Sequence, residues 1–114
     1  MNLLGKFRDW ASRLSEHGLR PIRITPSGFE SGKSVVSWSA VTKIAAFKKD
    51  LVTFDDIWFV FSAGQDEVLV CEEQPGFAEL LAEVKARFPS VEGWEQQVVQ
   101  PAFAESYTVL YVGP

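Results

Sequence analysis

Hydrophobic residues recur along this chain with two different periods, and the period changes near Pro75. Between residues 19 and 72 they form short runs separated by turn-forming sequences, which is typical of strands joined by tight turns. Between residues 76 and 100 they recur every three or four positions, which indicates helix. The pattern predicts an α+β fold in which a strongly bent antiparallel sheet is packed by a C-terminal amphipathic helix.

The most apolar predicted strand covers residues 57–61, where bulky apolar side chains fall on both faces. This arrangement is typical of a central strand that is covered on both sides. A short turn at 63–66 leads to a partner strand at 68–71, so Ser62 should pair with Glu67. Earlier strands are expected at 19–24 and, after a kink at 38–41, at 42–49. The segment 106–112 is either a last strand or an extended tail laid over the core.

Two helical segments are expected in addition to the sheet. In the C-terminal one, a single face carries the apolar residues Phe77, Leu80, Leu81, Val84 and Phe88. The second short helix of this segment should begin near Ser90, with the serine as its cap. The N-terminal segment 1–17 predicts an additional amphipathic helix over residues 2–16, which we expect to cover a face or an edge of the sheet. Because its polar side carries basic residues, an interfacial position on a membrane is the alternative.

The length, composition and net charge of the chain narrow the class of protein. A length of 114 residues fits a single domain covering 1–114, and 46% hydrophobic residues exclude a disordered chain. The formal net charge is -4 and the lysines and arginines are scattered, which argues against a nucleic-acid partner. No apolar run approaches the length of a membrane span and no signal peptide is evident, so a cytoplasmic location is the expectation.

Four acidic residues should gather at the open end of the hairpin formed by 57–61 and 68–71. If Ser62 pairs with Glu67, Ile57 lies opposite Glu72 and Asp56 lies opposite Glu73. The predicted cluster consists of Asp55, Asp56, Glu72 and Glu73. Like charges across a strand pair destabilise it, so a compensating charge is required. It comes either from the chain itself, through solvated lysines at 48 and 49, or from a basic protein partner.

Aromatic residues fall into two groups. Trp38, Trp58 and Trp94 occupy predicted core positions. Phe29 and Phe54 lie in predicted loops, where they either anchor a partner or fold back onto the core.

No catalytic, metal or cofactor site is predicted. Cys71 is the only cysteine and His17 the only histidine, so no pair of cysteines with metal-ligand spacing exists. Cys71 lies within an apolar run, where a buried role is expected. No phosphate-binding or nucleophile motif appears, and we therefore expect a protein that is not an enzyme.

The order of features from Ile22 to Phe88 resembles a bacterial PH-like domain. The residues that carry the resemblance are Ile22, Ile24, Gly28, Phe29, Val36, Trp38, Val41, Ile44, Ile57, Phe59 and Phe61, followed by a hairpin and an amphipathic helix. The sequences Glu72-Glu73, Pro75-Gly76-Phe77 and Arg87-Phe88-Pro89 also resemble those of small bacterial proteins of this length. The resemblance implies a bent sheet that forms all or part of a barrel, closed by the helix, and a protein- or lipid-binding platform.

The leading hypothesis is a non-enzymatic interaction domain that binds a protein partner through Asp55, Asp56, Glu72, Glu73 and Phe54. One form of it is an immunity-like protein that docks onto a basic nuclease. Two alternatives stay open. One is peripheral membrane binding through residues 2–16, and the other is a small-molecule carrier or enzyme with a pocket between helix and sheet.

Overall fold

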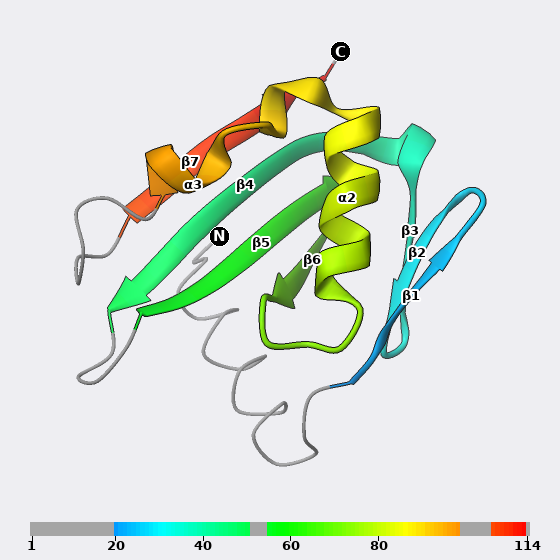
Figure 1. The fold of residues 1–114 in the computed structure, drawn as a ribbon. Coiled ribbons are helices and arrows are strands. Elements are labelled where there is room, and N and C mark those ends of the chain that lie inside the picture. The colour runs from blue at the N-terminus through cyan, green and yellow to red at the C-terminus, as the bar shows by residue number, and fades with distance from the viewer. Residues whose placement is uncertain (1–19, 51–54, 99–105, 114) are drawn as a thin grey trace.

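Two antiparallel sheets and a layer of helices make up the described part of the computed structural model (Figure 1), which comprises residues 20–50, 55–98 and 106–113. The predicted α+β class is therefore confirmed. In place of one strongly bent sheet there are two, and neither is closed. The predicted N-terminal helix, residues 1–17, lies outside the described residues.

The three-stranded sheet consists of β1 (Ile22–Thr25), β2 (Gly28–Ser31) and β3 (Ser34–Ser37), each paired with the next through a tight turn. Phe29 is fully buried, so it packs onto the core and does not anchor a partner, although it lies in β2 rather than in the predicted loop. Its ring packs against the ring of Phe61, with the two centroids 4.9 Å apart. The sequence predicts a loop here because this short strand lies between two turn sequences and Phe29 is its only large hydrophobic residue.

A 3₁₀ turn, η1 (Trp38–Ala40), forms the predicted kink and leads into the second sheet. That sheet has four strands in the order β6-β5-β4-β7, with β4 (Val41–Asp50), β5 (Asp55–Ala63), β6 (Asp66–Cys71) and β7 (Ser106–Val112). The predicted pairing of Ser62 with Glu67 is confirmed. The alternative of a last strand at 106–112 is also confirmed, since β7 pairs with β4.

Strand β5 is covered on both faces, as its sequence predicts. Ile57, Phe59 and Phe61 belong to the main core under the helices, whereas Trp58 and Val60 belong to a second apolar cluster. The other members of this second cluster are Phe47, Leu69 and Cys71. The buried position expected for Cys71 is confirmed.

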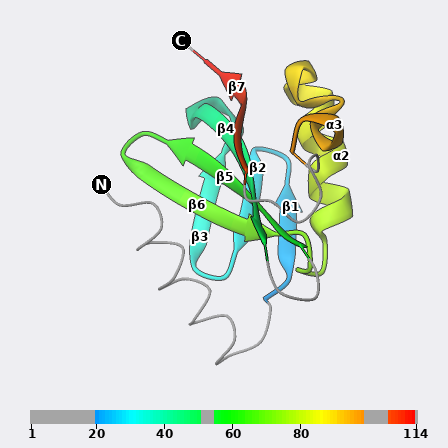
Figure 2. The ribbon, with the colours of Figure 1, turned by 90° about the vertical axis from the view of Figure 1, so that its left-hand side faces the viewer.

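The helical layer comprises α2 (Phe77–Arg87), η2 (Pro89–Val91) and α3 (Trp94–Val98). Viewed from the side, α2 and α3 lie together on one side of the four-stranded sheet (Figure 2). Helix α2 buries Phe77, Leu80 and Val84, as its periodicity predicts. Ser90 does not cap a helix, because its hydroxyl donates to the carbonyl oxygen of Leu110 on β7 at 2.7 Å.

Candidate protein-binding surface

The residues of the predicted acidic cluster lie in two places along the chain: Asp55 and Asp56 begin β5, and Glu72 and Glu73 follow the end of β6. In the strand register Asp50 pairs with Asp55 and Lys49 pairs with Asp56. Phe54 lies outside the described residues, and Asp55 and Asp56 are described by their backbone pairing alone. The backbone amide of Glu72 donates to the carbonyl oxygen of Ile57 at 3.2 Å, so Glu72 lies opposite Ile57 as expected.

Glu73 does not pair with Asp56 in the β5–β6 ladder. The ladder ends at Trp58 and Cys71, and the chain then turns away from β5. The turn forms because the backbone amide of Gln74 donates to the carbonyl oxygen of Cys71 at 3.0 Å. The backbone amide of Glu73 meets the sulfur of Cys71 at 3.4 Å, and its carboxylate is exposed to solvent.

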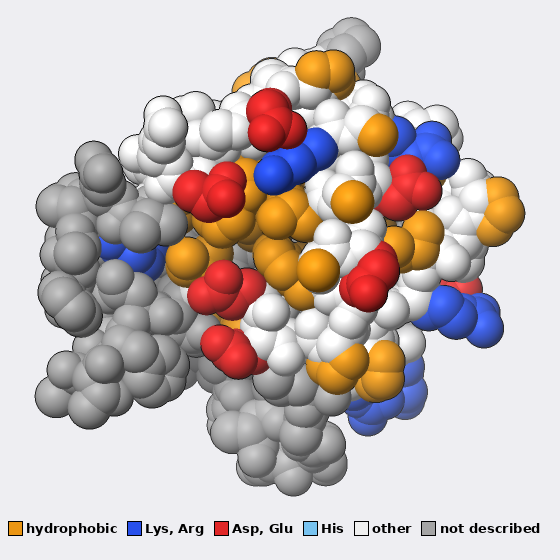
Figure 3. Space-filling view, in the orientation of Figure 1, with side chains coloured by type: hydrophobic (Ala, Val, Ile, Leu, Met, Phe, Trp, Pro, Cys, Tyr) orange, Lys and Arg blue, Asp and Glu red, His pale blue; other side chains and the backbone are white. Residues whose placement is uncertain are grey.

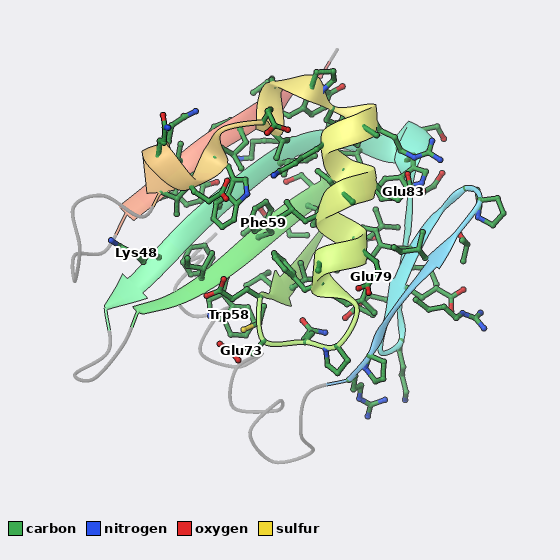
Figure 4. All side chains as sticks on the ribbon, in the orientation of Figure 1. Lys48, Trp58, Phe59, Glu73, Glu79 and Glu83 are labelled. Carbon is green, nitrogen blue, oxygen red and sulfur yellow. The ribbon has the colours of Figure 1, made fainter. Side chains whose placement is uncertain are left out.

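The expected pair of solvated lysines is also corrected. Lys49 arrives beside Asp56 in the register, but Lys48 has only 1% of its surface exposed. Lys48 has the same strand parity as Ile44 and Ala46, which places its side chain on the helix-covered face. Figure 4 shows it at the end of β4, beside the start of β7. Lys48 is therefore buried rather than solvated.

Gln74 holds the turn that carries Glu72 and Glu73, and the sequence analysis did not predict this role. Only 2% of its surface is exposed. Its Oε1 accepts from the backbone amide of Cys71 at 2.8 Å, and its Nε2 donates to the carbonyl oxygen of Arg20 and to the hydroxyl of Ser31, both at 3.0 Å. A buried amide whose donor and acceptor are both used fixes its surroundings in one arrangement. The side chain thereby joins the end of β6 to the three-stranded sheet.

Backbone contacts after Gln74 reinforce this junction. The backbone amide of Ile22 donates to the carbonyl oxygen of Pro75 at 2.8 Å. Gly76 has a φ of +90°, and a Cβ on it would lie 2.5 Å from the carbonyl oxygen of Ile22. Only glycine fits this left-handed, crowded position. Pro75 and Gly76, where the sequence pattern changes from strand to helix, thus set the position of the turn with Glu72 and Glu73.

Negative charge is concentrated in one segment of the chain. Residues 72–98 contain six glutamates, one lysine and one arginine, so this segment alone carries a net charge of -4, which equals the formal net charge of the whole chain. We call these carboxylates the acidic surface, which consists of Glu72, Glu73, Glu79, Glu83, Glu92 and Glu95.

The two basic residues of the segment neutralise only part of this surface. The Nε of Arg87 lies 3.5 Å from the Oε2 of Glu83, and the Nζ of Lys85 lies 3.9 Å from the Oε1 of Glu92. Glu73, Glu79 and Glu95 are exposed, and within the described ranges they have no ion-pair partner. Figure 4 shows Glu73 below α2 and Glu79 and Glu83 along it. The surface therefore keeps a net negative charge.

Apolar side chains lie among these carboxylates. On the face shown in Figure 3, hydrophobic atoms are visible between α2 and α3, and acidic side chains surround them. Phe59 of β5 fills the space between the two helices, since its ring contacts Phe77 of α2 and Trp94 of α3 with centroid distances of 5.5 and 5.0 Å. The indole Nε1 of Trp94 is buried and makes no hydrogen bond. Phe59, Phe77 and Trp94 are all buried, so these rings belong to the core beneath the surface, and the carboxylates are its exposed part.

Comparison with known proteins gives no relative: no family model matches the chain, and no curated protein or solved structure is similar to it. In the part of the chain that the structure describes, no three His, Cys, Asp or Glu side chains lie close enough together to hold a metal ion. The helices there are all too short or too polar to cross a membrane.

Proposed function

We propose that this protein is a non-enzymatic interaction domain that binds a basic protein partner through the acidic surface of its helical layer. The observation that carries the proposal is the distribution of charge. The segment 72–98, which comprises the helical layer and the turn before it, has a net charge of -4, equal to that of the whole chain, and three of its carboxylates have no ion-pair partner among the described residues. A basic protein surface is the complement of such a face.

The position of this surface in the fold supports the same proposal. The turn with Glu72 and Glu73 is fixed to the three-stranded sheet by Gln74, and α2 is fixed to the core by Phe77, Leu80 and Val84. The carboxylates are therefore displayed on a rigid frame, which lowers the entropy lost on binding. The resemblance to PH-like domains agrees with this proposal, since it implies a binding platform rather than a catalyst. A nuclease neutralised by an immunity-like protein is one partner of the required charge.

Charge reversal tests the proposal. The test variant is Glu79→Lys with Glu95→Lys. The control is Glu30→Lys with Glu67→Lys, which changes the net charge equally outside the segment but also breaks the ion pair of Glu30 with Arg23. A short oligolysine peptide serves as the probe, and amide chemical shifts of the full chain report where it binds. We expect shifts concentrated in residues 72–98, an affinity that falls as salt is raised, and a loss of at least tenfold in the test variant alone.

Affinity capture from a cell extract at low salt then identifies the natural partner. A captured basic protein whose binding is lost in the test variant and kept in the control supports the proposal. The proposal fails if the peptide shifts are spread evenly over the chain. It also fails if no basic protein is captured, or if both double variants weaken binding equally.

A further inference from the structure

Strand β7 forms an edge of the four-stranded sheet that differs from the opposite edge. Within the described residues no strand lies beyond β7, and none beyond β6 on the other side. Strand β6 begins with Asp66 and Glu67, whereas β7 (Ser106–Val112) contains no charged residue and no proline. Edge strands are normally protected from pairing with other chains by such residues. Strand β7 lacks this protection.

Three of the four exposed large hydrophobic side chains of the described residues lie on β7. They are Tyr107, Val109 and Val112, with 46, 45 and 70% of their surface exposed. Their partners on β4 are Phe47, Ala45 and Lys43, which alternate along that strand and therefore point to the same face of the sheet. A bulge between Val109 and Tyr111 brings Val112 onto this face. The result is an apolar stripe along the sheet edge, on the side opposite the helices.

The free backbone groups of β7 can be assigned from the register. The backbone amide of Gly113 donates to the carbonyl oxygen of Thr42, so the even-numbered residues of β4 direct their backbone groups toward β7. Ala46 pairs with Thr108, and Lys48 pairs with Ser106. Thr108 and Ser106 thus use their backbone groups for β4. Because alternate residues of a strand point their backbone groups to opposite sides, those of Tyr107 and Val109 face away from the sheet.

We propose that β7 pairs with β7 of a second copy of this chain, antiparallel about a two-fold axis at Thr108. In this register Tyr107 lies opposite Val109 of the second copy, and both residues present outward N–H and C=O groups. Each such pair exchanges two main-chain hydrogen bonds, and the axis generates the pair twice. The same register places an aromatic ring beside a β-branched side chain, which is a favourable cross-strand combination. The two apolar stripes then join on one face.

A second copy fits this edge because the strand is its own complement. Pairing of two identical strands fails when like charges meet, and β7 has no charge to oppose. The C-terminal half of the strand is less available, since the hydroxyl of Ser90 already occupies the carbonyl oxygen of Leu110. The interface is therefore short and falls below the area of a permanent dimer, so we expect a reversible dimer with a micromolar dissociation constant.

This inference goes beyond the proposed function and uses a different face of the molecule. Sedimentation analysis of the full chain over a concentration series gives the dimer dissociation constant. Val109→Lys places a charge in the interface between the two β7 strands. Val109→Pro removes the outward N–H without changing the hydrogen bonds to β4. Val35→Lys is the matched control, because Val35 is an equally apolar residue, 74% exposed, on β3. We expect both Val109 variants to raise the dissociation constant at least tenfold and the control to leave it unchanged.

Amide hydrogen exchange in the unmodified chain gives a readout that needs no variant. In the dimer the amides of Tyr107 and Val109 become protected as concentration rises, while those of Ser106 and Thr108 stay protected throughout. Added salt should leave the dimer intact, in contrast to binding at the acidic surface, so the two proposals fail separately. A chain that sediments as a monomer at every concentration overturns the inference. So does a dimer that both Val109 variants leave unchanged, or one in which the amides of Tyr107 and Val109 exchange freely.

Discussion

Replacing Gln74 by leucine removes the polar junction between the two sheets while nearly preserving side-chain volume. The side chain makes three hydrogen bonds and has 2% of its surface exposed. In Gln74→Leu the buried amide of Cys71 loses its acceptor, which costs about 1–3 kcal/mol. The hydroxyl of Ser31 loses one partner, which adds about 0.5–1.5 kcal/mol. The carbonyl of Arg20, an exposed residue, regains a bond from water. We expect the free energy of unfolding to fall by about 2–4 kcal/mol.

Equilibrium unfolding in urea, followed by tryptophan fluorescence, measures this change as a shift of the midpoint. Gln97→Leu is the matched control, because Gln97 is exposed on α3 and the same chemical change there should alter the free energy of unfolding by no more than about 0.5 kcal/mol. Amide exchange at Cys71 should accelerate in the Gln74 variant. The reasoning is refuted if the two variants have the same stability, or if Cys71 keeps its protection.

Two pairs of substitutions test the packing that supports the acidic surface. Gly76→Ala and Gly93→Ala both place alanine at a positive φ, but only at Gly76 would the new Cβ meet a backbone atom, the carbonyl oxygen of Ile22 at 2.5 Å. Thermal unfolding should show that the free energy of unfolding falls by about 1 kcal/mol in Gly93→Ala and by at least twice as much in Gly76→Ala. Equal losses of stability would show that the close approach of Gly76 to Ile22 is unimportant. Leu80→Ala should lower the free energy of unfolding in urea by about 2–4 kcal/mol, because Leu80 is buried beneath α2. Leu81→Ala, at a partly buried position, should lower it by less than half as much. The reverse order would mean that α2 presents a different face to the sheet.

Features that depend on neighbouring residues were predictable from the sequence. The face of α2 with Phe77, Leu80 and Val84 follows from helical periodicity, and the two-sided burial of β5 follows from its continuous apolar run. The hairpin register of Ser62 with Glu67 follows from the short turn between two apolar strands. In each case the residues that decide the structure lie within one element or one turn of each other.

Features that depend on distant residues were not predictable. The hydrogen-bond partners of Gln74 lie 3, 43 and 54 positions away, so no local pattern marks it as a buried residue. Lys48 is buried because strand parity places it under the helical layer, although lysine is normally exposed. Of the residues predicted for the site, Glu72 and Glu73 are exposed, and their role in binding stays a prediction. The four other glutamates, on α2, on α3 and just after η2, are brought near them only when the helices fold against the sheet.

The junction at Gln74 also sets an order for folding during synthesis. The three-stranded sheet is complete at Ser37 and needs only contacts between neighbouring strands, so it can form while the rest of the chain is still being made. Its attachment to Pro75 and Gln74 must wait until those residues leave the ribosome, and it closes a long stretch of chain. Until then the apolar side of this sheet, with Phe29 and Val36, has no cover from α2. A nascent chain stalled before Gln74 should therefore recruit chaperones, and one that extends beyond β7 should not.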